Sequence, residues 1–237
     1  MIIKMIPIYI VSYKNQDRKL RMIDRFKKLN LDNYITFTSE VDHDDSRLTS
    51  ISHESKRGCS ALLQHLDSLR NFLNTEEESC IVCEDDIYIS KTLSEKLPSI
   101  LYDFKLMNLD ILMLSYILPI KIQMDHEYHQ YYFPYYNKPE DKILINYSHT
   151  YHHYPNDIWG AQMYLVSRNY ARYILENFDI THDTTIEKFK DCPLVDWIIT
   201  KNGNRALIYP MLAVEENGIN YNREAYLEVN YKPELFY

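Results

Sequence analysis

Three consecutive acidic residues directly follow a short apolar segment of the chain. The segment Cys80–Cys83 contains β-branched residues and is typical of a buried strand, and Glu84, Asp85 and Asp86 come immediately after it. Unpaired carboxylates are too costly to bury, so these acids must lie where the strand leaves its sheet, facing a crevice, paired or bound to a cation. Clustered oxygen ligands suit Mg²⁺ or Mn²⁺, above all an ion that also holds phosphates. A metal–nucleotide site is therefore the first hypothesis, and a solvated acidic turn is its alternative.

The segments around this triplet predict alternating strands and helices. Strands are expected at residues 6–11, 33–38, 80–83 and 109–114, and helices at residues 16–29 and 59–73. This order predicts an α/β fold with a Rossmann-like, mostly parallel central sheet flanked by helices. Ligands of such sheets bind beyond the carboxyl ends of the strands, where the triplet falls. Further along, a strand is expected at residues 159–166, a helix after Ser167, a short helix near Pro193 and a strand at 207–210.

Composition narrows the class of protein. The 237 residues suit a single domain, and the sequence contains no linker, internal repeat or glycine-rich phosphate loop. The net charge of −8 argues against general binding to nucleic acid or to acidic membranes. No apolar run is long enough to span a bilayer. We therefore expect no nucleic-acid partner, no membrane span and a cytoplasmic location.

Two of the four cysteines, Cys80 and Cys83, have the C-x-x-C spacing of zinc and redox sites. Residues three apart in a strand point to opposite faces, and no second Cys or His pair stands nearby at zinc-ribbon spacing. We expect buried, reduced thiols at these two positions. The chain as a whole fits cytosolic chemistry better than a disulfide framework.

Six segments of the chain occur in the same order in a known family. They are Ile8–Val11 with Asp17-Arg18, Gly58–Ser60, Val82–Asp86, Gly160–Arg168, Pro193–Asp196 and Tyr209-Pro210. In these segments the chain resembles glycosyltransferase family 25, the group of lipopolysaccharide-type and collagen galactosyltransferases. The resemblance implies a GT-A fold, a uridine diphosphate (UDP) sugar as donor, dependence on Mn²⁺ (or Mg²⁺) and inversion at the sugar carbon. We expect residues 1–118 to bind the nucleotide sugar and residues 119–237 to bind the acceptor.

One departure from the family pattern follows Gly58-Cys59. Family members often carry a Ser-His pair there, whereas this chain has Leu62-Leu63, and its nearest imidazole is His65. A donor contact made by that pair is then lost or supplied by other residues. A catalytically inactive nucleotide- or sugar-binding protein on the same fold is therefore the alternative to an enzyme.

The resemblance also implies roles for the acids of the triplet. In a DxD-type arrangement the last acid binds the metal, which makes Asp86 the expected direct ligand. Glu84 is expected at the ribose, at a metal-bound water or on the metal itself, and Asp85 is auxiliary. Many GT-A enzymes add a metal ligand from near the C-terminus, often a histidine, but no histidine follows His182. Glu215 is the expected substitute, with Glu216 and Asn217 as alternatives and a surface charge cluster as the competing interpretation.

An inverting transferase needs a base for the acceptor hydroxyl. Asp196, within Pro193–Trp197, matches the family position best, although acids are also favoured in the first turn of a helix for electrostatic reasons. Asp157, beside Trp159, is the second candidate.

The donor nucleotide is expected over the end of the first strand. Ser12, Tyr13 and Arg18 are placed to contact it, with Tyr13 able to stack on the base and Arg18 able to pair with phosphate. Asp42, after the second strand, could bind uracil or ribose. All four also fit ordinary surface residues.

Residues 116–155 are dense in tyrosine and histidine. The aromatic faces of this tract suit the C–H surfaces of a sugar acceptor, and a packed loop or a homodimer contact are the alternatives. The leading hypothesis is thus a metal-dependent, inverting hexosyltransferase that moves galactose or glucose from a UDP-sugar to a glycan or protein hydroxyl. A metal-dependent phosphodiesterase is disfavoured because the sequence lacks the many His and Asp ligands of two-metal sites.

Overall fold

The structure is a computed structural model that describes residues 5–49, 51–53, 56–117, 149–153, 160–178, 195–200, 202–216, 227 and 231–237. The sequence predictions for Asp157 and Asn217, for the start of the short helix at Pro193 and for most of the tyrosine- and histidine-rich tract lie outside these residues.

Strands and helices alternate through the first half of the chain, as predicted. The described elements are β1 (Ile8–Val11), α1 (Gln16–Lys28), β2 (Ile35–Phe37), α2 (Lys56–Leu73), β3 (Ser79–Glu84), β4 (Ile87–Ile89), α3 (Leu93–Leu106), β5 (Ile111–Met113), β6 (Thr150–His153), β7 (Met163–Ser167), α4 (Arg168–Phe178), α6 (Val195–Thr200), β8 (Arg205–Tyr209) and β9 (Ala213–Glu215), with 3₁₀ helices at Asp32–Tyr34 and Ser46–Leu48. The sequence pattern did not predict α3, β4, β6 or β9.

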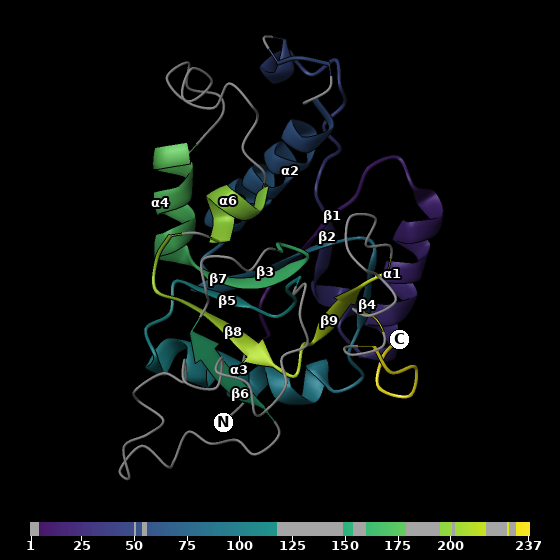
Figure 1. The fold of residues 1–237 in the computed structure, drawn as a ribbon, viewed down its shortest axis with the longest axis vertical. Helices are drawn as coiled ribbons and strands as arrows, with labels where there is room; N and C mark the ends of the chain where they lie inside the picture. Colours follow the sequence, from purple (N-terminus) through teal and green to yellow (C-terminus); the bar gives the residue numbers. More distant parts are fainter. Residues whose placement is uncertain are drawn as a thin grey trace.

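The central sheet has seven strands in the order β2-β1-β3-β7-β5-β8-β6 (Figure 1). β1 pairs in parallel with β2 and β3, and β5 pairs in parallel with β8. β7 runs antiparallel between β3 and β5, and β6 runs antiparallel to β8. The sheet is therefore mixed: β1, β2, β3, β5 and β8 point the same way, in keeping with the predicted mostly parallel sheet, and β7 and β6 point the other way. A strand buried on both faces is a continuous apolar run whichever way it points, so its sequence does not record its direction.

The reversed direction of β7 brings its first residues to the edge of the sheet where β3 and β5 end. In these pairings Cys83 lies opposite Met163, and Met113 lies opposite Tyr164. Next to this edge, β4 and β9 form a separate antiparallel pair in which Ile87 lies opposite Glu215. Segments far apart in the sequence therefore meet where β3 ends.

Helices cover both faces of the sheet (Figure 1). Residues of α2, α4 and α6 pack with Cys80 on one face, and residues of α1 and α3 pack with Cys83 on the other. Both cysteines are buried free thiols, which confirms their prediction. Cys59 of α2, by contrast, is in a disulfide. This bond was not predicted from the sequence, because spacing along the sequence does not show which distant cysteines meet.

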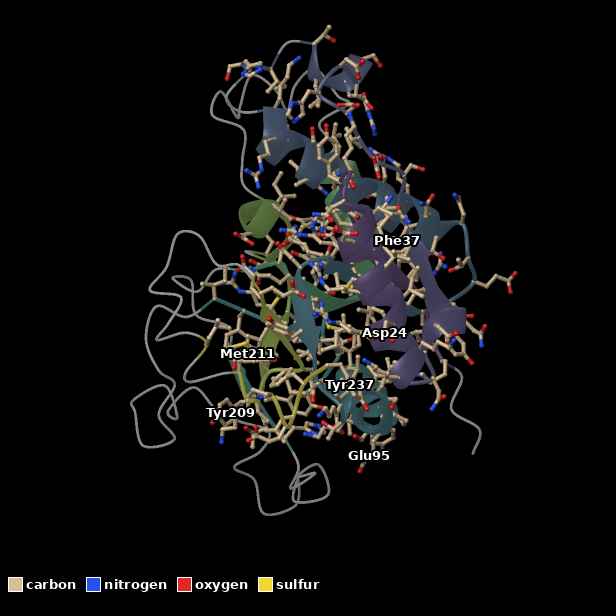
Figure 2. The ribbon with its side chains drawn as sticks, turned by 90° about the vertical axis from the view of Figure 1, so that its right-hand side faces the viewer. Asp24, Phe37, Glu95, Tyr209, Met211 and Tyr237 are labelled. Carbon is tan, nitrogen blue, oxygen red and sulfur yellow. The ribbon has the colours of Figure 1, made fainter. Side chains whose placement is uncertain are left out.

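α1 begins immediately after a capped turn that follows β1. The side chain of Asn15 accepts a hydrogen bond from the backbone N–H of Arg18 at 3.0 Å, which fixes the first helical turn. Figure 2 shows Asp24 and Phe37 on one side of the molecule and Tyr209 and Met211 on the other. Among the described residues, no helix is both long enough and apolar enough to cross a membrane.

Candidate active site

The acidic triplet lies where β3 leaves the central sheet, as predicted. Glu84 is the last residue of β3 and pairs with Val11 of β1. Asp85 and Asp86 follow in the turn to β4. The earlier residues of β3 are buried, whereas the Glu84 side chain is 32% exposed. Its carboxylate is therefore open to a ligand.

Asp85 is a buried member of the triplet that neighbouring side chains hold in place. Ser12 Oγ donates to Asp85 Oδ2 at 2.6 Å, and Arg18 Nη1 donates to Asp85 Oδ1 at 3.2 Å. Arg18 Nη1 also lies 3.1 Å from Asp86 Oδ2. The structure thus brings Ser12 and Arg18 to the acids, and Arg18 sets a positive charge beside them.

Glu215 joins this cluster from the far end of the chain. It lies opposite Ile87 in the β4–β9 pair, directly after the turn that contains Asp86. Burial, followed by repulsion from neighbouring acids, raises the pKa of Glu84, Asp86 and Glu215 to about 7. The charge of Glu84 acts on both Asp86 and Glu215. The site therefore holds more negative charge than its own residues neutralise.

These carboxylates are the groups that could hold a divalent cation. Within the described ranges, no group of three or more His, Cys, Asp or Glu side chains is arranged to hold a metal ion. The donor set nevertheless fits Mg²⁺ or Mn²⁺, since such ions prefer oxygen ligands and in nucleotide sites take one or two carboxylates together with phosphates. A cation would also lower the raised pKa values of the acids. The site fits a cation that is bound together with a diphosphate.

A buried histidine of α2, which the sequence analysis did not select, faces the acidic cluster. His65 Nδ1 lies 3.0 Å from the Tyr164 hydroxyl, and His65 Nε2 lies 3.6 Å from Glu84 Oε1. Burial lowers the pKa of His65 to about 4, against the opposing effect of Asp196, so the imidazole is neutral at pH 7. In the sequence, His65 could have been found from its position two residues after Leu62-Leu63, where family members often carry a Ser-His pair.

Asp196 lies in the first turn of α6. Its charge raises the pKa of Glu215 and opposes the lowering of the pKa of His65. Helix α6 packs against α2, the helix that carries His65. An acid from the second half of the chain therefore acts electrostatically on Glu215 and His65.

Tyr13 and Asp42 meet at the ends of β1 and β2, as neighbouring strand ends should. The Tyr13 hydroxyl donates to Asp42 Oδ1 at 2.8 Å, and Lys14 forms an ion pair with the same carboxylate. The Tyr13 ring stacks on His43, with centroids 5.8 Å apart and planes 7° from parallel. Hydrogen bonds from Lys14 and Tyr13 lower the pKa of Asp42 to about 2. This exposed group is therefore anionic and preorganised.

An α/β sheet with carboxylates clustered at its strand ends is typical of proteins that bind nucleotides through a cation. The chain matches the family Glycosyltransferase family 25 (LPS biosynthesis protein) over residues 5–186. This match covers more than half of the chain, so the protein belongs to that family and is a glycosyltransferase, with the GT-A fold that the family implies. No curated protein matches the sequence. Asp196 and Glu215 lie beyond the matched residues, so their assignment depends on the geometry.

Proposed function

We propose that the protein is a metal-dependent, inverting hexosyltransferase that moves galactose or glucose from a UDP-sugar to a hydroxyl of a glycan or protein. The observation that carries this proposal is the convergence of Glu84, Asp86 and Glu215, each with its pKa raised to about 7. Family membership provides the reaction class, and the acidic cluster provides the place for a cation and a diphosphate.

The donor diphosphate is assigned to the acidic edge. Asp86, with Glu84 and Glu215, would hold the divalent cation, which when bound supplies positive charge to the leaving diphosphate. Arg18, between 3.1 and 3.2 Å from the carboxylates of Asp86 and Asp85, adds a fixed cationic group that can pair with phosphate oxygens. The buried contacts of Asp85 support the position of Arg18 rather than a direct role in binding.

The uridine is assigned to the exposed group at the ends of β1 and β2. Tyr13 offers an aromatic face to the uracil ring, and the stacked His43 holds that face in place. Asp42 is anionic and can accept a hydrogen bond from uracil or from a ribose hydroxyl. Ser12, between this group and Asp85, links the two parts of the donor site.

Asp196 is the proposed base. In an inverting transfer the acceptor oxygen bonds to the sugar carbon as the bond from that carbon to the diphosphate breaks, and the base takes the hydroxyl proton. The proposal is supported by the electrostatic effect of Asp196 on Glu215 and His65 and by the packing of α6 against α2. Asp157 stays the second candidate. The division into donor and acceptor halves, the cytoplasmic location and a homodimer also stay predictions.

The test is thermal unfolding with UDP in the presence of Mn²⁺ or of EDTA, followed by incubation with UDP-galactose and UDP-glucose. We expect stabilisation that needs the metal, slow donor hydrolysis, and an inverted anomeric configuration by NMR when an acceptor is supplied. No stabilisation by UDP under either condition would contradict the proposal.

Binding without turnover in the same test would favour a catalytically inactive binding protein, the alternative raised by Leu62-Leu63. Both leucines are fully buried in the core, so they do not contact a ligand. His65 instead brings an imidazole to Glu84, which supports the enzyme.

A further inference from the structure

Two polar residues lie opposite each other on neighbouring strand ends beside the acidic cluster. Glu84 N donates to the carbonyl of Gln162 at 2.9 Å. This bond continues the register of β3 with β7, so Glu84 lies opposite Gln162. Cross-strand neighbours share a face of the sheet, and the pair two residues earlier, Val82 and Tyr164, belongs to the core packed against α2. Glu84 and Gln162 therefore form a polar row at the α2 face.

Gln162 buries an acceptor that nothing satisfies in the part of the chain that the structure describes. Its side chain is 6% exposed, and Gln162 Oε1 has no hydrogen-bond partner there. The amide of Gln162 is correctly oriented, because its Nε2 lies 3.5 Å from Glu215 Oε2 and a reversed amide would oppose two oxygens. Native proteins seldom leave such atoms unbonded, so they mark the place of a ligand or water.

His65 adds a donor to this row. Its Nε2 is fully buried and, among the described residues, has no hydrogen-bond partner at normal distance. The Glu84 carboxylate favours the tautomer with the ring proton on Nε2, in which the Tyr164 hydroxyl donates to Nδ1. Fixed acceptors next to a donor complement hydroxyl groups, which both donate and accept. Ionised phosphate oxygens only accept hydrogen bonds and cannot donate to Gln162 Oε1, so a neutral, polyhydroxylated ring fits this position best.

We propose that Gln162 binds a hydroxyl of the transferred sugar, which donates to Oε1 while Glu215 holds the amide from its other side. This inference rests on the proposed function and makes Gln162 a residue that determines which donor sugar is accepted.

The experiment is a chemical double-mutant cycle on the Gln162→Met variant, which keeps the length of the side chain and removes the carbonyl. UDP, UDP-galactose, UDP-glucose and analogues that lack one sugar hydroxyl are titrated calorimetrically in Mn²⁺ into both proteins. We expect UDP to bind both within about twofold, and the preferred UDP-sugar to bind the variant about tenfold more weakly, the scale of one hydrogen bond. The analogue that lacks the contacted hydroxyl should bind both proteins equally. Equal weakening for UDP and UDP-sugar, or a tenfold effect that persists with every analogue, overturns the inference.

A matched control is Tyr151→Phe on β6, the strand at the opposite edge of the sheet from β2. It removes a buried hydroxyl that donates to Asp103 at 2.7 Å. It should leave UDP-sugar affinity unchanged. If Gln162→Met does not fold, titration of the deoxy analogues into the unmodified protein still tests the inference. If every analogue binds as tightly as the parent UDP-sugar, the inference is overturned. If UDP binds but no deoxy analogue binds more weakly than the parent UDP-sugar, this inference alone is overturned. Binding of neither UDP nor UDP-sugar overturns the proposed function and the inference together.

Discussion

The backbone N–H of Glu216 donates to the backbone carbonyl of Asp86 at 2.7 Å. This bond extends the β4–β9 pair, in which Glu215 lies opposite Ile87. Main-chain bonds, rather than the carboxylates themselves, therefore hold Asp86 and Glu215 next to each other. The cluster keeps its shape although its charges repel, so we expect substitutions of these acids to change charge with little change in the backbone.

Asp86→Asn should abolish the stabilisation that Mn²⁺ and UDP produce together, because it removes the expected direct ligand. A ligand at a hundredfold excess over its Kd stabilises a protein by about 2.7 kcal/mol, and this amount should be lost. In EDTA at pH 8 the variant should unfold at a higher temperature than the unmodified protein, since one repelling charge is gone. Thermal unfolding measures both effects. Asp24→Asn, at an exposed acid of α1, is the control, and an unchanged response to Mn²⁺ and UDP in Asp86→Asn would remove Asp86 from the site.

In EDTA, the free energy of unfolding should fall as the pH rises toward the pKa values of the acidic cluster. Glu84, Asp86 and Glu215 have pKa values of about 7 in the folded protein, above their ordinary values near 4. Between these limits the folded state binds more protons than the unfolded state, so the free energy of unfolding decreases with pH and levels off above about 7. Urea unfolding at pH 5 to 8 measures this slope.

His65 acts in the opposite direction over part of the same window. Its pKa is lowered from 6.5 to about 4 in the folded protein, so its contribution to stability rises with pH between these values. The net fall should therefore be steepest near about pH 6, where the folded acids still hold most of their protons and the unfolded imidazole is already losing its own. Glu84→Gln should flatten it, and saturating Mn²⁺ with UDP should remove most of it. If Glu84→Gln left the dependence of the free energy of unfolding on pH unchanged, the raised pKa of Glu84 would be contradicted.

Arg25→Met should destabilise the protein by about 3 kcal/mol, because it leaves a buried carboxylate without its closest partner. Arg25 forms an ion pair with Glu216, donates to the Ile87 carbonyl at 2.8 Å and packs on the Tyr88 ring at 5.0 Å. It thereby joins α1 to β4, which follows Asp86, and to Glu216, which follows Glu215 at the end of β9. Urea unfolding measures the loss.

The control for Arg25 is Lys28→Met on the same helix, where an exposed pair with Asp24 should contribute less than about 0.5 kcal/mol. Adding Glu216→Gln to Arg25→Met should restore part of the stability, since no unpaired charge then stays buried. Equal losses in Arg25→Met and Lys28→Met would show that this buried ion pair does not support the site.

Asp196→Asn should lower the transfer rate by about 10²- to 10⁴-fold while UDP binding stays within about twofold, because a base acts only on the acceptor. Steady-state kinetics and UDP titration measure the two effects. Glu176→Gln, at an exposed acid of α4, is the control. Full activity in Asp196→Asn would move the base elsewhere, with Asp157 next to be tested.

Local features of the chain predicted much of the fold. The apolar run before Glu84 and the acids after it located the end of β3, because burial and charge act on adjacent residues. The apolar spacing along α1 and α2 located both helices. The direction of β7 could not be predicted, since a strand buried on both faces has the same pattern either way.

The candidate site was only partly accessible to sequence reasoning. Asp86 and Glu215 were named as partners, and the structure places them together through the β4–β9 pair. His65 and Gln162 were passed over, because a histidine or a glutamine in an apolar segment does not differ from an ordinary core residue. Their unbonded atoms became visible only when α2 and β7 were seen against Glu84.

The sequence by itself determined that three carboxylates stand at the end of a buried strand and that this pattern belongs to a glycosyltransferase family. The tertiary structure decided which groups meet them: Arg18 from α1, Glu215 from β9, and His65 and Gln162 from α2 and the start of β7. The physical reason is that burial and periodicity are local properties of a chain. Contacts between distant residues instead depend on strand order and direction, which local spacing does not encode.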